Sequence, residues 1–535
     1  MIPDSEHGET SKVVRGGEEV KVQERPVPSR RADRLPVIPR ASAAPSVMPA
    51  LPKFARGPVW AAMAALATML TAFSGRYGYH RDELYFRMLS PGWGYVDQPP
   101  LTPVLARLSR MIADEPWAMR IPATLATVAS VWILVLITRE LGGGRCAQAL
   151  CAWGYAFASL PLIMGHALLT STIDLPVWPA IVLFIIRTQL RKQPQWWLAA
   201  GLVVGLSMYN KLLVAVLLLS LAVGLLLTGP RRVLWSKAVL AGMALALFVG
   251  LPNLVYQATH GWPQLSVGRA LAAQNAGEVH LMMVPFLFLI LGPPLVPIWV
   301  AGLVNLVRRP EWRALRFLAA AFPVLLVVVF VMGSQVYYPF GLLAVLFAIG
   351  CVPAEAWLVG RLRRRVAVTA VAANAAVSLA LGLPVIPLTA LGATPVPAIN
   401  QVAQDTIGWP TYVRQIADVY ANLPAPDRRR TVIIASNYGE AGAVDRYGGS
   451  YQLPAVYSGL NDLYYQRRPP ASATGAVFVG GQLGRAHSLF RSCVVAGHLD
   501  NGLGVDNEEQ GEPIAVCQGP IGGWPVVWPA LQHEG

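Results

Sequence analysis

Long apolar segments recur between residues 58 and 386, and short polar stretches separate them. A helix needs about 20 mainly apolar residues to cross the hydrocarbon core of a bilayer. Eleven segments approach this length, so the pattern predicts about eleven membrane-spanning helices. They are residues 58–74, 118–138, 147–165, 174–190, 195–210, 212–228, 237–257, 282–305, 317–333, 338–358 and 366–386.

The two flanks of this apolar region differ from each other. Residues 1–57 are rich in charge and proline and have no apolar periodicity, which is typical of a disordered tail. Residues 391–535 alternate strand-like and helix-like runs, which predicts a soluble α/β domain. We therefore expect three parts: a tail at residues 1–57, an all-α membrane domain at residues 58–390, and the α/β domain at residues 391–535.

Composition agrees with a polytopic membrane protein. Hydrophobic residues make up 54% of the 535 residues and charged residues only 13%, against about 25% charged residues in ordinary soluble domains. The formal net charge of +14 raises the question of a nucleic-acid partner. The answer depends on where the basic residues lie.

Basic residues concentrate in alternate loops between the predicted spans. These are Arg139 and Arg145; Arg187, Arg191 and Lys192; Arg231, Arg232 and Lys237; Arg308 to Arg316; and Arg361 to Arg365. Because short cytoplasmic loops carry excess Lys and Arg, these loops and the N-terminus are predicted to be cytoplasmic. An odd number of spans then makes the C-terminal domain extracytoplasmic. Membrane insertion accounts for the positive charge, and with no base-reading module present we expect no nucleic-acid partner.

Carboxylates gather on the opposite, extracytoplasmic side, chiefly in the first external loop at residues 75–117. Within this loop "RDELYFRML" has helical spacing, and "PPLTPVLARLSRMI" predicts an amphipathic helix too short to span. Asp82, Glu83 and Asp97 lie among aromatic residues that suit the membrane interface. Carboxylates at membrane depth are costly unless they are paired or functional. We therefore expect a protein-lined pocket here; the alternative is a solvated loop with local ion pairs.

The motif "YHRDELYF…WGYVDQPPL" resembles the polyprenyl-phosphate-sugar-dependent glycosyltransferases of family 39, the protein mannosyltransferase-like group with the GT-C fold. The motifs "TSTIDLP", "MYNKLL", "GSQVYYP", "IGWP" and "NYGEAGA" extend this resemblance to about residues 58–460. It implies a GT-C-like membrane domain and an external active site fed by a lipid-linked donor. It also implies an Asp-Glu pair after the first membrane helix, which falls on Asp82 and Glu83, while "DQPPL" falls on Asp97 to Leu101.

The expected chemistry needs a base and a cation. A sugar ester of a polyprenyl phosphate has a stable anion as its leaving group, so catalysis requires positive charge near the phosphate and removal of the acceptor's proton. Asp82 is the predicted base, and Glu83 and Asp97 would position it or hold sugar hydroxyls. Direct displacement at the anomeric carbon predicts inversion.

Candidate phosphate ligands are the cations on the extracytoplasmic side. Lys211 in "MYNKLL" ranks first, although a lysine at a helix end can also simply extend to the interface. Arg81 ranks second and Arg269, in the predicted external loop before residue 282, competes with it, since arginine can hold phosphate with two hydrogen bonds. His80, beside Arg81, is also a candidate for substrate binding.

Three further residues are candidates for recognition of the donor. Asp174 would recognise the sugar or support the base; alternatively it is a carboxylate favoured by the dipole at a helix N-terminus. Tyr337 and Tyr338 would line the path of the lipid or the sugar, or serve as ordinary interfacial aromatics.

The motif "NYGEAGA" in the C-terminal domain follows a predicted strand. Because α/β sheets commonly bind ligands at this position, acceptor recognition and a plain helix cap are both open.

Metal and disulfide chemistry stay open at this stage. His80, His166, His260 and His280 fall near external ends, but their spacing matches no compact metal-binding motif. A divalent ion therefore remains an alternative without assigned ligands. Cys493 and Cys517 share the extracytoplasmic domain, where oxidation is permitted, and could form a disulfide.

The sequence therefore predicts a multi-pass cell-membrane glycosyltransferase, which moves a hexose or pentose from a polyprenyl-phosphate donor to an extracytoplasmic glycan, lipid or protein. The alternative is a transporter or a flippase for lipid carriers. Such proteins place ionisable groups in the middle of their spans and often consist of two repeated halves. The predicted spans hold few such charges and show no repeat, which favours the glycosyltransferase.

Overall fold

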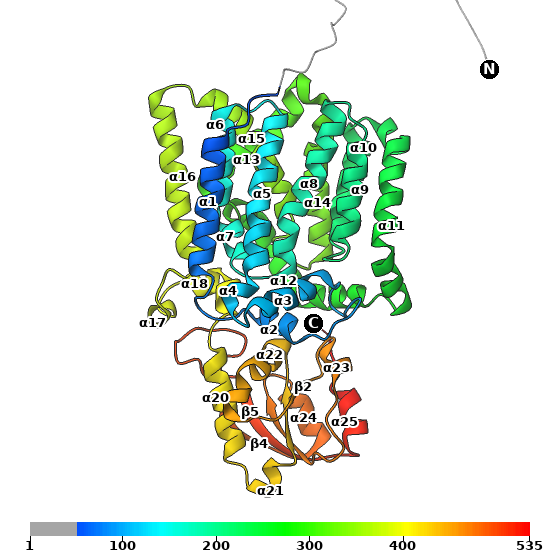
Figure 1. Ribbon diagram of the computed structural model, residues 1–535, viewed down its shortest axis with the longest axis vertical. Coiled ribbons are helices and arrows are strands. Elements are labelled where there is room, and N and C mark those ends of the chain that lie inside the picture. Colours follow the sequence, from blue (N-terminus) through cyan, green and yellow to red (C-terminus); the bar gives the residue numbers. More distant parts are fainter. Residues whose placement is uncertain (1–50, 535) are drawn as a thin grey trace, which may run out of the picture. The chain divides into compact units, whose positions relative to one another are not determined.

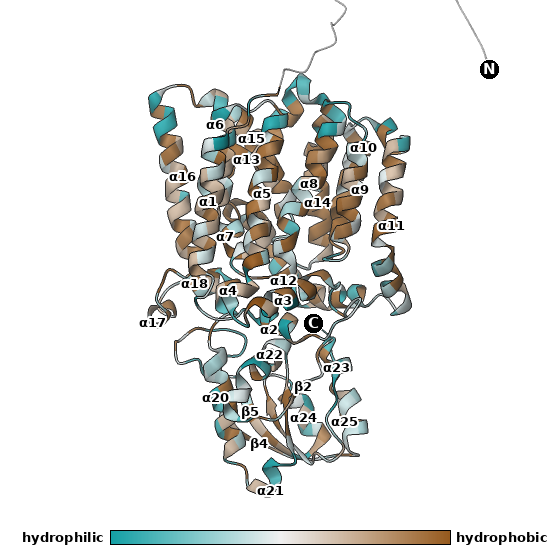
Figure 2. Cartoon of the chain, in the orientation of Figure 1, coloured by the Kyte–Doolittle hydropathy of each residue, from teal (hydrophilic) through white to brown (hydrophobic). Residues whose placement is uncertain are grey.

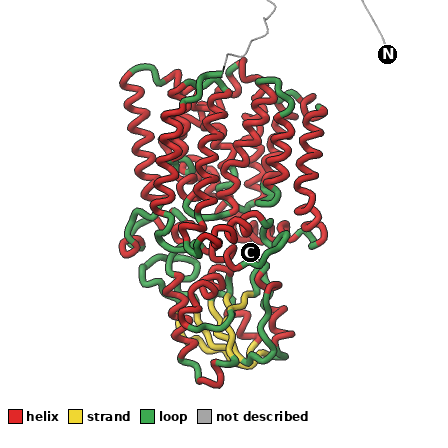
Figure 3. The backbone as a smooth tube through the Cα atoms, viewed as in Figure 1, coloured by secondary structure: helices red, strands yellow, loops and turns green. Residues whose placement is uncertain are grey.

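A computed structural model describes residues 51–534 of the chain. The predicted tail at residues 1–57 lies mostly outside the described residues, and the predicted domain boundaries stay predictions. Helices dominate the described chain, and strands occur in its C-terminal part alone (Figure 3).

Residues 56–382 form a bundle of helices (Figure 1). Its helices are α1 (Arg56–Phe73), α5 (Ile121–Glu140), α6 (Arg145–Ala156), α7 (Ser159–Gly165), α8 (Thr170–Leu190), α9 (Trp196–Ser207), α10 (Val214–Thr228), α11 (Lys237–Thr259), α12 (Pro263–Leu289), α13 (Val296–Arg308), α14 (Arg316–Met332), α15 (Phe340–Trp357) and α16 (Arg361–Gly382). Three 3-10 turns connect some of them: η1 (Arg231–Trp235), η2 (Pro293–Leu295) and η3 (Pro310–Leu315).

Every predicted apolar segment overlaps at least one of these helices. Within residues 51–534, six helices are long and apolar enough to cross a membrane, or up to eight if each of two bent pairs is one span. The pairs α6–α7 and α12–α13 bend by 54° and 71°. The second bend falls at Gly292, Pro293 and Pro294, where proline cannot continue the helical hydrogen bonding. The structure thus shows a polytopic helical domain, and the count of eleven spans stays a prediction.

Hydrophilic residues lie at the ends of the bundle's helices, while the middle of the bundle is mainly hydrophobic (Figure 2). Arg187 of α8 and Arg191, the residue just after this helix, both bond to Glu140 at the end of α5. Arg139 of α5 donates a hydrogen bond to the carbonyl of Pro52, just before α1. The start of α1 and the ends of α5 and α8 therefore lie on the same side of the bundle.

The first loop lies at the opposite end and contains α2 (Arg81–Met88), α3 (Leu101–Ile112) and α4 (Pro116–Met119). The two helices predicted in this loop are thereby confirmed. α3 buries small residues and exposes the large apolar side chains of Leu108, Met111 and Ile112. An exposed apolar face on a helix too short to span suits a position along the membrane interface.

The C-terminal part forms a five-stranded sheet with strand order β2-β1-β3-β5-β4. The strands are β1 (Thr431–Ala435), β2 (Val456–Ser458), β3 (Gly475–Val479), β4 (Phe490–His498) and β5 (Pro513–Pro520). β1, β2 and β3 are parallel, whereas β5 runs antiparallel to both β3 and β4. This arrangement confirms a small α/β domain.

Short helices connect the bundle to the strands and cover the sheet. They are α17 (Leu388–Leu391), α18 (Val396–Ile399), α19 (Gln401–Gln404), α20 (Trp409–Ala421), α21 (Ala425–Arg428), α22 (Tyr438–Tyr447), α23 (Leu463–Gln466), α24 (Leu483–Leu489) and α25 (Trp524–Ala530), with the 3-10 turn η4 (Gly448–Tyr451). We call residues 409–534 the sheet domain. Cys493 of β4 and Cys517 of β5 form a disulfide, which answers the question left open by the sequence.

The sheet domain contacts the first loop directly. Helix α22, which follows β1, packs against α2, and Gly442 of α22 touches the backbone of Leu84. A Cβ atom on Gly442 would lie 2.7 Å from that backbone, so the contact requires glycine. The carboxyl end of β1 is therefore held beside the acidic residues of the first loop.

Candidate active site

His80 begins the helix that carries the candidate acidic residues. Its Nδ1 accepts a hydrogen bond from the backbone N–H of Asp82, and its own backbone N–H donates to Glu83 Oε2 at 2.9 Å. This reciprocal cap satisfies two N–H groups that a helix N-terminus otherwise leaves free. Burial lowers the pKa of His80 to about 3, so its imidazole is neutral at physiological pH. These contacts favour a structural role for His80 over substrate binding.

Glu83 connects α2 to the bundle through a buried ion pair. Its side chain is 0% exposed and accepts two hydrogen bonds of 3.1 Å from the guanidinium of Arg120. The backbone N–H of Leu168 donates a further bond of 2.9 Å to Oε1. Arg120 also donates to the carbonyls of Ser74 and Gly78. With its hydrogen bonds directed to protein groups, Glu83 is suited to position α2 and not to contact a substrate.

Asp82, its neighbour, is half-buried and faces the sheet domain. The hydroxyl of Tyr438 donates a hydrogen bond to Asp82 Oδ1 at 3.1 Å. Burial raises the pKa of Asp82 above its ordinary value, and this rise is opposed by the positive charge of Arg81, by the bond from Tyr438 and by the charge of Lys211. A carboxylate with a raised pKa and few hydrogen bonds is suited to accept a proton.

Asp97 lies close to Asp82 on the other side of two tyrosines. Tyr85 donates to Asp97 Oδ1 at 2.9 Å, and its ring lies 4.8 Å from the ring of Tyr438. Burial raises the pKa of Asp97 to about 7, against the effect of the Tyr85 bond and with added repulsion from Asp462 and Asp82. The negative charge of Asp82 is therefore one of the causes of the raised pKa of Asp97.

Asn210 joins three of the motifs that the sequence presents far apart. Its Nδ2 donates to Asp174 Oδ1 at 2.9 Å and to the carbonyl of Thr170 at 2.8 Å. Its Oδ1 accepts from the hydroxyl of Thr102, which follows "DQPPL". Because Asn210 is buried and these bonds fix both ends of its amide, Lys211 next to it has a defined position.

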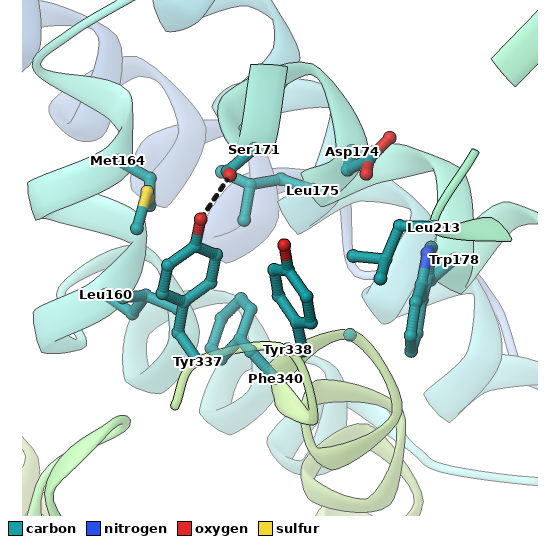
Figure 4. A pocket seen from close by; sticks show the side chains of 11 residues that line it. Leu160, Met164, Ser171, Asp174, Leu175, Trp178, Leu213, Tyr337, Tyr338 and Phe340 are labelled. Atoms are coloured by element: carbon teal, nitrogen blue, oxygen red, sulfur yellow. Dashed lines mark hydrogen bonds between the residues drawn. The ribbon is translucent and has the colours of Figure 1, made fainter. Parts of the chain in front are cut away.

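Lys211 lies beside a pocket inside the bundle. Its Nζ is 4.9 Å from the centre of the Tyr338 ring, which lines the pocket. Figure 4 shows the pocket between α7, α8 and α15. It is lined by Leu160, Met164, Ser171, Asp174, Leu175, Trp178, Leu213, Tyr337, Tyr338, Phe340 and Gly341.

The pocket has an apolar wall and few polar groups. The hydroxyls of Ser171 and Tyr337 are 2.9 Å apart and bond to each other (Figure 4). Asp174 Oδ2 is buried and has no hydrogen-bond partner among residues 51–534. A buried oxygen without a partner costs free energy, so a ligand hydroxyl in this pocket would find an acceptor there.

Arg81 and Arg269 differ in their surroundings. Arg81 forms an ion pair with Glu508, and its guanidinium lies 4.8 Å from the centre of the Tyr438 ring. Arg269 is exposed on α12, and within the described part of the chain no hydrogen bond or ion pair connects it to Asp82 or Lys211. The structure thus brings Asp82, Asp97, Lys211, Asp174, Tyr337 and Tyr338 together at one end of the bundle and leaves Arg269 outside these contacts.

Sequence reasoning missed several residues of this site. Tyr85 and Asn210 lie inside quoted motifs, and Arg120 lies at the start of the predicted span 118–138, but none of the three gave a signal of its own. Tyr438 lies in "NYGEAGA", where Asn437 and Glu440 form the cap of α22. The motif therefore forms a helix cap, which was one of its two predicted roles. Tyr438, within this cap, contacts Asp82 of the first loop. Among residues 51–534, no group of three or more His, Cys, Asp or Glu side chains is placed to hold a metal ion.

The comparisons with known proteins agree with this picture. Residues 97–256 match the family described as dolichyl-phosphate-mannose-protein mannosyltransferase. The crystal structure of ArnT from Cupriavidus metallidurans bound to undecaprenyl phosphate has a similar fold, with a TM-score of 0.56 at 14% sequence identity. That match covers 85% of this chain and 97% of ArnT. The family match and the shared fold confirm the resemblance that the motifs predicted.

Two further structures are less similar. Arabinofuranosyltransferase AftD from mycobacteria matches with a TM-score of 0.47 at 14% identity, over 86% of this chain and 40% of AftD. The archaeal oligosaccharyltransferase AglB from Archaeoglobus fulgidus, in complex with an inhibitory peptide and a dolichol-phosphate, matches with a TM-score of 0.42 at 12% identity. This second match covers 75% of this chain and 64% of AglB. No curated protein is detectably similar to the chain in sequence.

The contacts of Glu83 predict that its removal affects stability. Glu83→Gln leaves the buried Arg120 without a counter-charge, which typically costs about 3–5 kcal/mol. We expect a clearly lower melting temperature of the purified protein in detergent. Glu278→Gln, at an exposed position of α12, is the matched control and should melt like the wild type. Equal melting of both variants would contradict the structural role of Glu83.

Proposed function

We propose that the chain is an integral-membrane glycosyltransferase that moves a sugar from a polyprenyl-phosphate donor to an acceptor on the extracytoplasmic side. The observation that carries this proposal is the placement of Asp82. It is a half-buried carboxylate of raised pKa, close enough to Lys211 to sense its charge, and Lys211 borders a largely apolar pocket in the bundle.

The distribution of charge supports the proposed orientation. Arginine-rich ends of helices lie on the side where α1 begins, as expected for the cytoplasmic side. The first loop and the sheet domain contact each other at the other end of the bundle. In this orientation the N-terminus is cytoplasmic, and Asp82 and the sheet domain are extracytoplasmic.

The pocket and Lys211 supply what a lipid-linked donor requires. A lysine ammonium stabilises a phosphate as a point charge, and ArnT, which shares this fold, has been crystallised with undecaprenyl phosphate. Lys211 is therefore assigned to the phosphate and Arg81 ranks second. Asp174 Oδ2 would accept a hydrogen bond from the donor sugar, and Tyr337 and Tyr338 would contact the donor along the pocket wall.

The reaction follows from these assignments. Asp82 takes the proton of an acceptor hydroxyl, and the hydroxyl oxygen forms a bond to the anomeric carbon as the bond from that carbon to the phosphate oxygen breaks. The polyprenyl phosphate leaves as an anion next to Lys211. Asp97 would hold acceptor or sugar hydroxyls, and Glu83 keeps α2 in place. A single displacement inverts the anomeric configuration.

The first test concerns the base. Asp82→Asn keeps the size of the side chain but cannot take a proton, so we expect transfer to fall at least about 100-fold. The measurement uses purified protein and a labelled polyprenyl-phosphate sugar, with melting temperature as the control for folding. A folded variant with normal turnover would remove Asp82 from the role of base.

The second test concerns the phosphate. Lys211→Ala should raise the KM for the donor by about tenfold or more, because the lost cation binds the donor's phosphate. Arg269→Ala removes an exposed cation from the same end of the bundle and should leave the donor KM unchanged. If the donor KM rises in Arg269→Ala and stays normal in Lys211→Ala, the phosphate assignment is wrong.

A further inference from the structure

Helix α2 is held by two different parts of the molecule. On one side Glu83 bonds to Arg120 of the bundle. On the other side several residues of α2 contact the sheet domain. Among them, Asp82 bonds to Tyr438, Arg87 bonds to Asp445 at 2.6 Å, and Leu84 packs against Gly442. The candidate base therefore sits on a helix whose outer face is supported by α22.

Tyr438 has a defined position within the sheet domain. It is the first residue of α22, directly after the cap residue Asn437, whose side chain accepts a bond from the N–H of Glu440 at 2.9 Å. Glu440 bonds in return to the N–H groups of Ser436 and Asn437. Ser436 follows β1 immediately, so the backbone at Tyr438 is held close to the sheet by a short segment with these hydrogen bonds.

The surroundings of Tyr438 keep its hydroxyl protonated, so that it can donate a hydrogen bond to Asp82. Burial raises the pKa of Tyr438 well above its ordinary value, so the phenol keeps its proton at physiological pH. The acceptor of the hydroxyl is a carboxylate, and hydrogen bonds to an ionised acceptor are the stronger ones. The Arg81 guanidinium lies 4.8 Å from the centre of the Tyr438 ring. The ring of Tyr85, at 4.8 Å, packs against it as well. The ring is thus held by contacts that do not involve its hydroxyl.

We propose that Tyr438 is a positioning residue for the transfer reaction and that the sheet domain thereby completes the active site. Its hydroxyl holds Asp82 Oδ1 in one orientation, which leaves Oδ2 to take the acceptor's proton. This inference rests on the proposed role of Asp82 as the base. It gives the sheet domain a part in the chemistry, in addition to the acceptor recognition or helix cap that the motif "NYGEAGA" indicates.

The charges around Asp82 determine how its pKa changes when the hydroxyl of Tyr438 is removed. Arg81 on α2, Lys211 in the loop after α9 and the bond from Tyr438 on α22 favour the ionised form of Asp82. Asp97 in the first loop and Asp405 before α20 oppose it as like charges. Without the Tyr438 bond the ionised form loses stabilisation and the pKa of Asp82 rises.

The test is Tyr438→Phe in the full-length protein, assayed with the labelled donor across a range of pH. Because the base must be ionised, kcat/KM falls on the acid side as Asp82 takes up a proton. We call this fall of kcat/KM at low pH the acid limb. In the variant we expect the midpoint of the acid limb to move to higher pH by roughly half to one pH unit. At pH values above the acid limb we expect kcat to fall about tenfold. The KM for the donor should stay unchanged, since Lys211 is untouched.

Tyr447→Phe is the matched control, because it removes a phenolic hydroxyl from the other end of the same helix. It should leave both kcat and the pH profile as in the wild type, and both variants should melt at the wild-type temperature. An unshifted acid limb in Tyr438→Phe, or an equal shift in Tyr447→Phe, would overturn the inference.

The outcome can be separated from that of the proposed function. If Asp82→Asn abolishes transfer while Tyr438→Phe keeps the wild-type pH profile, Asp82 remains the base and Tyr438 loses its role. If Asp82→Asn turns over normally, the base assignment fails first, and the inference about Tyr438 fails with it.

Discussion

The site depends on one buried ion pair, between Glu83 of α2 and Arg120 at the start of α5. Burying two charges costs several kcal/mol per ion unless their hydrogen bonds are satisfied. Here Arg120 donates hydrogen bonds to Glu83 and also to backbone carbonyls of the loop after α1. Glu83 in turn accepts hydrogen bonds from backbone N–H groups, including that of Leu168. This pair anchors α2 to the bundle, and it decides which face of α2 is left for chemistry. Asp82, one residue earlier on the helix, takes no part in this pair; it accepts a hydrogen bond from Tyr438, and the charge of Lys211 lowers its pKa.

The remaining motifs assemble around that anchored helix through buried polar contacts. Asn210 connects the first loop to α8, Lys211 lies against Tyr338, and Tyr438 reaches Asp82 from the sheet domain. Each contact joins residues more than a hundred positions apart in sequence or brings separate helices together. The result is a set of charged groups at one end of an apolar bundle, which differs from the mid-membrane placement typical of transporters.

Sequence reasoning was strongest where one physical rule dominates. Bilayer thickness explains why every predicted apolar segment overlaps a helix. The alternation of strand-like and helix-like runs in residues 391–535 predicted an α/β domain, and pairs such as β1 with α22 and β3 with α24 follow it. The cost of carboxylates at membrane depth directed attention to Asp82, Glu83 and Asp97. Long-range pairing could not be predicted in this way. Nothing in "MYNKLL" indicates that Asn210 bonds Asp174, and nothing in a helix cap indicates that its tyrosine meets a carboxylate 356 residues earlier.

The central claim is that the first loop and its acidic residues face the extracytoplasmic side. Two thiols at opposite ends of the bundle test this placement. One is a cysteine in place of Trp93, which is 79% exposed in the first loop, and the other is the native, exposed Cys146 in the first turn of α6. A membrane-impermeant maleimide would be applied to intact cells that carry one of two proteins. The double variant Trp93→Cys, Cys146→Ser reports on residue 93, and the wild type reports on Cys146. Residue 93 should be labelled in intact cells, and Cys146 only after permeabilisation. The reverse pattern would place Asp82 in the cytoplasm, where it could not act on an extracytoplasmic acceptor.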